Sequence, residues 1–226
     1  MRIGLGMNTK KTKAMAENVE NPEVRSLDGT LLEVVKDFNY LGAWIASTQN
    51  DIRIRRARAW SALHSMKRVW KSGMNDYLKR RLFVATVEIV LLYANYGCES
   101  WALTVKDEKA LDGVYTRMLR TALNVSWEDH MRNTDLYGYL PRLSGTIRQR
   151  QMRVAGQCVR HPELKANEMI LWEPTHGKKS RGRPHVKFID TLKRDTRLNS
   201  TTEIKILMMD RDEWRAAIRR SQVGLT

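Results

Sequence analysis

Basic side chains are the residues of this 226-residue chain whose type and spacing point most directly to chemistry. Lys10, Lys11 and Lys13 lie close together in the segment GLGMNTKKTKAM. An ammonium group is a compact charge with transferable protons, so a lysine here could neutralise or protonate a phosphate leaving group. Composition alone favours an exposed basic loop, and the phosphate role is the alternative.

A second basic group lies in the segment SGTIRQRQMRVAGQCVRH, which begins at Ser144. Its apolar residues recur at helical spacing, which predicts a helix with one buried side that includes Val154. Arg148, Arg150 and Arg153 remain for the other side. A guanidinium matches the geometry of a phosphate better than an ammonium does, so these arginines could follow a nucleic-acid backbone. A solvated helix face explains the pattern equally well.

The segment KKSRGRP is the sharpest short motif, and it contains Lys178, Lys179, Arg181, Gly182 and Arg183. Arg-Gly-Arg-Pro is the core of an AT-hook, in which glycine lets the backbone enter a narrow minor groove between two arginines. We favour a basic turn in which Pro184 leads into a helix. Contact with a nucleic-acid backbone and recognition of A·T pairs are the alternatives.

The sequence contains no self-sufficient active site. Cys158, His161 and His176 could ligate a metal, but a structural zinc site uses four ligands, so we expect no metal and no cofactor. No Ser/His/Asp set, phosphate-binding loop or pair of catalytic carboxylates stands out. Two cysteines do not make a disulfide framework, which makes a reducing, intracellular compartment the default.

The charge balance predicts a polyanionic partner. Forty Lys and Arg against 25 Asp and Glu give a net charge of +15, and nucleic acid is the first candidate for such a surplus. Residues 142–197 alone contain fourteen Lys or Arg and five Asp or Glu. The longest apolar run, residues 82–98, contains Glu88 and is shorter than the roughly 20 residues that span a bilayer. We therefore expect a buried core helix and no membrane contact.

The aromatic and β-branched stretch FNYLGAWI, residues 38–45, separates two kinds of pattern. Before it, Asp28-Gly29 is a strong hairpin signal. Residues 31–35 and 39–45 would be strands of a three-stranded meander. After it, helical periodicity dominates, which predicts a mainly α fold with a small N-terminal β part. We divide the chain into residues 1–48, a helical bundle at 49–125, and a basic helical region at 126–226.

Three helices are expected in the bundle, with short connections that suggest antiparallel packing. The first begins at Asn50 or Asp51 and ends near Gly73. The second runs from about residue 75 to 101. The third is capped by Thr104 with Asp107 in a capping box. The predicted buried residues are Ala59, Leu63, Met66 and Trp70, then Leu82, Ala85, Ile89, Leu92 and Tyr96, then Leu111, Val114, Tyr115, Met118, Ala122 and Leu123. A further helix over residues 204–218 would be anchored by Trp214.

Nine segments occur in an order that is familiar from one protein family. They are GLGMNTKKTKAM, VVKDFNYLGAWI, RARAWSALHSMKRVWKS, RRLFVATVEIVLLY, GCESWALT, LDGVYTRMLRTALNVSWEDH, LYGYLP, LWEPTHGKKSRGRP and RDEWRAAI. Together they resemble the C-terminal part of the reverse transcriptase (RNA-directed DNA polymerase) of LINE-type, non-long-terminal-repeat retrotransposons. The resemblance covers nearly the whole chain and implies the end of a palm, a thumb and a C-terminal region.

The resemblance implies roles for particular residues. Lys11 matches the palm lysine that assists at the leaving pyrophosphate, with Lys13 beside it. Phe38, Tyr40, Leu41 and Gly42 match the primer grip, which positions the growing 3′ end. Residues 51–125 match the thumb, which holds the template–primer duplex mainly through its backbone.

The chain also departs from the family pattern. The Tyr-x-Asp-Asp motif, the earlier aspartate and the fingers are missing, and those carboxylates hold the Mg²⁺ ions that an intact polymerase of this family uses. Ala94-Asn95-Tyr96 resembles an insertion, which would rotate the following helix face. Gln157 stands where related sequences often have His. These departures suggest a decayed copy.

We therefore expect a truncated fragment that binds RNA, an RNA–DNA hybrid or DNA and does not polymerise alone, unless another chain supplies the catalytic half. Nuclear residence is the expectation from the family and the basic run. Two alternatives stay open. The chain could be a small DNA-binding module that uses the RGRP segment, or a decayed product without function.

Overall fold

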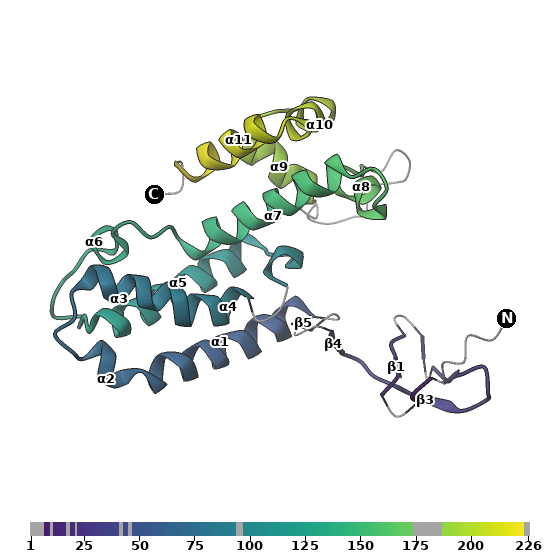
Figure 1. Ribbon diagram of the computed structural model, residues 1–226, viewed down its shortest axis with the longest axis horizontal. Helices are drawn as coiled ribbons and strands as arrows, with labels where there is room; N and C mark the ends of the chain where they lie inside the picture. Colours follow the sequence, from purple (N-terminus) through teal and green to yellow (C-terminus); the bar gives the residue numbers. More distant parts are fainter. Residues whose placement is uncertain are drawn as a thin grey trace.

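The computed structural model describes residues 7–9, 11–16, 19–20, 22–40, 43–44, 47–93, 97–173 and 187–223. Within them the chain is mainly helical, with short strands near the N-terminus (Figure 1). This confirms the predicted fold class. Among the described residues, no helix is long and apolar enough to cross a membrane.

The strands form two small sheets rather than one meander. β1 (Lys13–Ala14) pairs in parallel with β3 (Leu31–Val34), and β2 (Val24–Arg25) pairs with the other edge of β3 in antiparallel fashion. The β2–β3 hairpin turns at Asp28-Gly29 as predicted, with Gly29 at φ +83°. The predicted meander is wrong, because β4 (Asn39–Tyr40) and β5 (Ala43–Trp44) pair only with each other.

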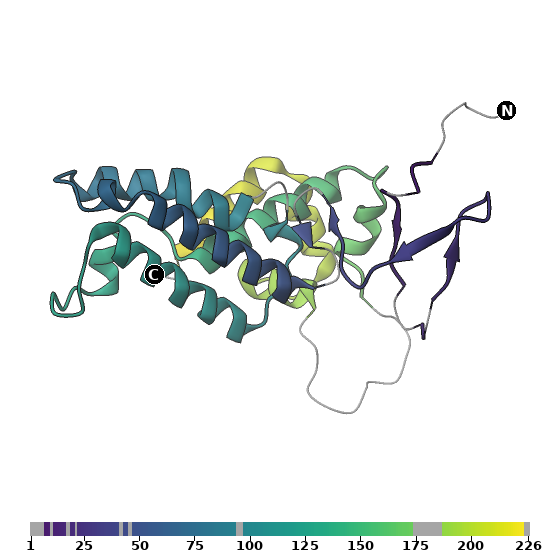
Figure 2. The ribbon, with the colours of Figure 1, turned by 90° about the horizontal axis from the view of Figure 1, so that it is seen from below.

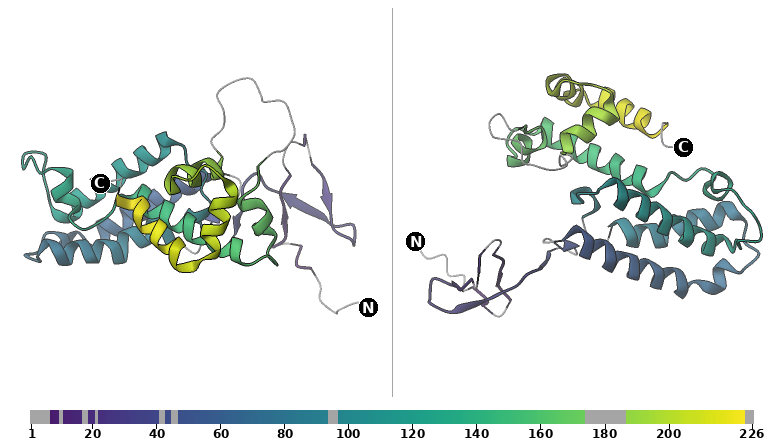
Figure 3. Two further views of the ribbon diagram at one scale, coloured as in Figure 1. Left: turned by 90° about the horizontal axis from the view of Figure 1, so that it is seen from above. Right: turned by 180° about the vertical axis from the view of Figure 1, so that it is seen from behind.

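β1, β2 and β3 stand apart from the helices, beyond the start of the first helix, whereas β5 contacts α1 (Figure 3). Leu32 is the only buried hydrophobic residue among those described between residues 7 and 44. Leu27, Leu31 and Val19 are exposed. The described part of the N-terminal region therefore has no core of its own.

The bundle contains three helical segments whose starts follow from local chemistry. They are α1 (Thr48–Ser65) continued by α2 (Lys67–Trp70); α3 (Asp76–Phe83) continued through the π-turn η1 (Val84–Glu88) into α4 (Ile89–Tyr93); and α5 (Val105–Leu123), which follows the turn η2 (Cys98–Ser100). Thr104 and Asp107 form the predicted capping box. Ser47 caps α1 through the amide of Asn50, a few residues before the predicted start.

The middle segment, α3 to α4, is where the predicted packing fails. Leu92 is buried as predicted, but the other buried residues are Phe83, Val87 and Leu91, whereas Ile89, which we expected inside, is exposed. Ala85, also expected inside, is exposed too. The helix is apolar around most of its circumference, and the π-turn shifts the register by inserting a residue. The described part of α4 ends at Tyr93, residues 94–96 lie outside the described ones, and a separate turn, Cys98–Ser100, precedes the predicted end at Trp101.

The first core joins α1, α3, α4, α5, the short helix α6 (Asn133–Tyr137) and the first half of α7 (Leu143–Arg160). The rings of Phe83 and Tyr115 meet edge to face at 5.3 Å between centroids. The Tyr115 hydroxyl donates to Glu88 at 2.6 Å, which gives the charged residue of the apolar run a partner. Burial raises the pKa of Glu88, and the tyrosine hydrogen bond opposes that rise.

The second core lies between the end of α7 and four C-terminal helices (Figure 1). These are α8 (Lys165–Ile170), α9 (Phe188–Thr196), α10 (Thr201–Met209) and α11 (Arg211–Val223). The single helix predicted over 204–218 is wrong, because Asp210 ends α10 and accepts hydrogen bonds from the amides of Asp212 and Glu213. Val154 on α7 is exposed, against the prediction. Helix α7 contributes to both cores: Leu143 and Ile147 pack in the first, and Met152, Ala155 and Val159 pack in the second.

A buried ion pair fixes the start of α1. Arg55 Nε lies 2.9 Å from Asp51 Oδ2, and Trp101 Nε1 donates to the same oxygen at 2.8 Å. Arg55 Nη1 also donates to the carbonyl of Leu92 at 3.3 Å. Both charged side chains are almost fully buried. One cluster therefore ties together α1, the end of α4 and the segment before α5.

Replacing Asp51 by Ala should destabilise the protein by about 3–5 kcal/mol, because Arg55 would be left as an uncompensated buried charge. The double variant D51A/R55M should recover part of that loss, since apolar replacement of both partners is often close to neutral. Chemical unfolding of the single and double variants measures the coupling. A double variant whose loss equals the sum of the two single losses would contradict the role of the pair.

Gly156 on α7 leaves space for Trp214 of α11. The Trp214 indole nitrogen donates to the Met152 carbonyl at 2.9 Å, and a Cβ at Gly156 would collide with that nitrogen. This close approach explains why a glycine lies inside a helix.

Gly156→Ala should therefore destabilise the second core by about 1–3 kcal/mol through overpacking. Gly113→Ala on α5 is the matched control, because a Cβ there has nothing within 4 Å and alanine is the better helix former by roughly 0.5–1 kcal/mol. Thermal unfolding should shift down for the first variant and up for the second. A stabilised G156A protein would show that Trp214 does not occupy this position.

Candidate nucleic-acid interface

The surface of α1 and α2 is the strongest concentration of unpaired positive charge in the described bundle. Residues 52–75 contain seven Lys or Arg and no Asp or Glu. Arg55 is turned inward, and the other six are exposed or half-exposed. We call these six the α1–α2 face: Arg53, Arg56, Arg58, Lys67, Arg68 and Lys71.

The α1–α2 face is accessible along its length. Seen from below, α1 lies across the near side of the bundle, with α3–α4 and α5 to either side (Figure 2). Its 18 residues span about 27 Å at 1.5 Å per residue. Over that length a nucleic-acid duplex carries on the order of 16 phosphate charges. The helix is thus long enough to follow a backbone over several phosphates.

The six cations of the α1–α2 face have no carboxylate partner within the described ranges. Arg53 donates to the side-chain oxygen of Asn50 at 2.9 Å, which orients it without neutralising it. Trp60 and His64 lie on the same side of α1, with ring centroids 5.5 Å apart. The surface therefore combines free cations with aromatic rings, as nucleic-acid-binding surfaces do.

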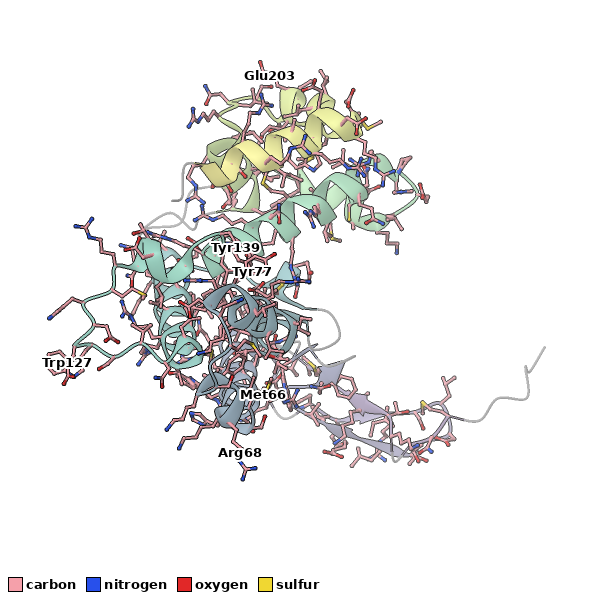
Figure 4. All side chains as sticks on the ribbon, turned by 60° about the vertical axis from the view of Figure 1, so that its left-hand side comes forward. Met66, Arg68, Tyr77, Trp127, Tyr139 and Glu203 are labelled. Carbon is pink, nitrogen blue, oxygen red and sulfur yellow. The ribbon has the colours of Figure 1, made fainter. Side chains whose placement is uncertain are left out.

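An aromatic pair lies beyond the end of α2. The rings of Tyr77, at the start of α3, and Tyr139, after α6, have centroids 5.5 Å apart and are inclined by 48°. Both side chains are more than half exposed, at 56% and 55%. Figure 4 shows them side by side, with Trp127 on a separate loop and Arg68 pointing away from the bundle.

The two tyrosines are held by contacts of the neighbouring Arg80. Its guanidinium donates to the carbonyls of Leu136 and Asp135 at 3.0 and 2.8 Å, which ties α3 to α6. Gly138 follows with φ +59°, a conformation that favours glycine. The guanidinium of Arg81 lies 5.9 Å from the Tyr77 ring centroid. The pair is thus positioned by the backbone on both sides.

The arginines predicted on α7 are mostly occupied inside the fold. Arg148 makes two hydrogen bonds to Glu108, at 3.1 and 2.5 Å, and lies 3.8 Å from Asp195. Burial lowers the pKa of Arg148, but the hydrogen bonds and charge of Glu108 raise it overall. Arg150 is half-buried beside Cys98 and Glu99. Arg153 is exposed and forms no salt bridge with another described residue.

The predicted N-terminal residues are placed only in part. Lys11 is exposed in a turn that its amide closes on Asn8. Lys13 lies in β1 and pairs with Glu33 at 2.9 Å. Phe38 is half-buried next to β4, and Tyr40 forms part of that strand. The following residues lie outside the described ones: Leu41, Gly42, Lys178, Lys179, Arg181, Gly182 and Arg183.

Neither cysteine belongs to a metal cluster in the described part of the chain, where no three His, Cys, Asp or Glu side chains could hold an ion. His161 lies 2.8 Å from Glu163. Burial raises the pKa of the Cys98 thiol to about 11, so it is neutral and unreactive at pH 7.

A cavity of about 820 Å³ lies among α7, α9, α10 and α11, with Arg148, Arg194, Arg197 and Arg220 in its wall. Three of these arginines lie at the C-terminal ends of α9 and α11. A helix C-terminus carries partial negative charge and attracts cations. Their position is therefore explained without a ligand, and the α1–α2 face remains the candidate interface.

Comparison with protein-family models, with curated proteins and with solved structures gives no match.

The arginines of residues 53–58 were not among the predicted site residues, although they lie in the segment 51–125 that resembles a thumb. The signal that could have placed them in the site is the absence of any carboxylate over 24 residues. The Tyr77–Tyr139 pair had no such signal, because the two residues are far apart in the sequence and meet only through α6.

Proposed function

We propose that this chain binds nucleic acid through the α1–α2 face and holds a duplex mainly by its phosphate backbone. The observation that carries the proposal is the acid-free segment 52–75, whose six outward cations lack carboxylate partners in the described structure. Free cations on a surface release the counterions of a polyanion when they bind it, and this release drives association.

The proposal favours duplex recognition without base reading. A helical surface with flexible Arg and Lys side chains suits phosphates, which are repeated regardless of sequence. An RNA–DNA hybrid is the substrate that we propose, because the chain resembles the thumb of a LINE-type reverse transcriptase. In that family the thumb holds the template–primer duplex.

The arrangement of β4, β5 and α1 supports the same proposal. The β4–β5 hairpin immediately precedes α1 and contacts it. If this hairpin acts as a primer grip, a duplex whose 3′ end lay there would continue along α1 toward α2. Lys11 would then be the palm lysine near the leaving pyrophosphate.

Catalysis requires residues that this sequence does not contain. It has no Tyr-x-Asp-Asp motif and no adjacent pair of aspartates. The polymerase reaction needs divalent ions held by carboxylates. We therefore propose a binding role, and polymerisation only if another chain supplies the catalytic half.

The triple variant R56A/R68A/K71A should bind an RNA–DNA hybrid at least about tenfold more weakly at roughly 0.1 M salt. The slope of log affinity against log salt should fall by about 2–3, since each lost phosphate contact removes close to one unit. Fluorescence anisotropy with a labelled hybrid across a salt series measures both quantities.

The matched control is K165A/K205A/R211A, which removes three exposed cations from the C-terminal helices. It should retain affinity within about twofold. Equal losses in the two variants would mean that net charge, not the α1–α2 face, drives binding. Absence of binding at low salt would refute the proposed function. A preference for A·T-rich DNA that Arg183→Ala abolishes would favour the DNA-binding module instead.

A further inference from the structure

We infer that Tyr77 and Tyr139 form a stacking site for an unpaired nucleobase at the end of the α1–α2 face. The inference rests on the proposed function and specifies the nucleic acid further: a duplex with a single-stranded extension. Aromatic side chains that stack on bases are the usual means of binding single strands without sequence preference.

The exposure of the pair is the first argument. Each ring is more than half exposed although the two contact each other, so aromatic surface remains open to a ligand. Arg81 adds a guanidinium 5.9 Å from the Tyr77 ring centroid, where it can attract a phosphate while the ring stacks on a base. An aromatic ring and a cation therefore lie together, which suits the base and the phosphate of a nucleotide.

The position of the pair is the second argument. Tyr77 follows Lys71 by six residues, so the two are at most about 20 Å apart. A strand held by the α1–α2 face could reach the tyrosines within a few nucleotides. Asp76, which precedes Tyr77 in the sequence, lies in the first turn of α3, where it complements the helix dipole.

The geometry selects an unpaired base. A base inside a duplex is stacked on both faces by its neighbours, whereas a strand extension presents free faces. The Arg80 hydrogen bonds to Asp135 and Leu136 hold the two segments together before any ligand binds. Preorganisation of this kind reduces the entropy lost on binding.

The test compares a blunt RNA–DNA hybrid with the same hybrid carrying a short single-stranded extension that contains 2-aminopurine. The wild-type chain should bind the extended hybrid about tenfold more tightly and quench the 2-aminopurine fluorescence. Y77A/Y139A should lose both effects while its affinity for the blunt hybrid stays unchanged. Y77F/Y139F, which keeps the rings, should behave as wild type. W127A removes an exposed aromatic side chain from another loop and should also behave as wild type.

An extension that adds nothing to wild-type affinity would overturn the inference while leaving the proposed function intact. So would an equal loss in the Phe and Ala variants, because the hydroxyls rather than the rings would then matter. Failure of the wild-type chain to bind even the blunt hybrid would overturn the proposed function and the inference together.

Discussion

The buried Asp51–Arg55 pair, with Trp101 donating to the same carboxylate oxygen, is the interaction on which the presentation of α1 depends. Helix α1 has four arginines within six residues and only a narrow apolar side formed by Ile52, Ala59 and Leu63. Apolar packing alone would orient such a helix weakly. Because Arg55 must reach the Leu92 carbonyl and Asp51 must accept from Trp101, the helix can rotate very little, and Arg53, Arg56 and Arg58 remain outside. A polar contact in the interior thus determines which charges the surface displays.

Two further arginines of the helical part are held against the fold by such partners. Arg148 bridges Glu108 and Asp195 across the two cores, and Arg160 donates to the Met208 carbonyl at 2.8 Å. Residues 142–197 contain most of the net charge, yet many of their described cations stabilise helix ends and helix contacts. A local surplus of cations therefore locates a binding surface only where those cations have no carboxylate or carbonyl partner within the fold.

Features set by neighbouring residues could be predicted from the sequence, and those set by distant contacts could not. The Thr104–Asp107 capping box, the buried side of α5 and the Asp28-Gly29 turn all depend on residues close together in the chain, and all three predictions are confirmed. The buried side of α3–α4 was predicted wrongly because apolar residues surround most of the helix and a π-turn interrupts it. The regular spacing of the buried positions is therefore not evident from the sequence. The second partner of β3 was predicted wrongly, since β1 rather than residues 39–45 pairs with that edge, and such pairing depends on contacts between residues distant in the sequence. Trp101 and Asp51 are 50 residues apart, so no pattern of neighbouring residues predicts their contact.

Site prediction follows the same division. The sequence showed the arginines of α1, but which of them faces inward depended on Leu92 and Trp101. The sequence does not predict that Tyr77 and Tyr139 form a pair, because the contact depends on Arg80 and α6, which bring the two residues together. If both surfaces act on one nucleic acid, the α1–α2 face supplies affinity that salt weakens, and the tyrosines supply affinity that salt affects less, because stacking involves no counterion release. The relative salt dependence of binding to blunt and extended hybrids would therefore separate the two contributions in the intact protein.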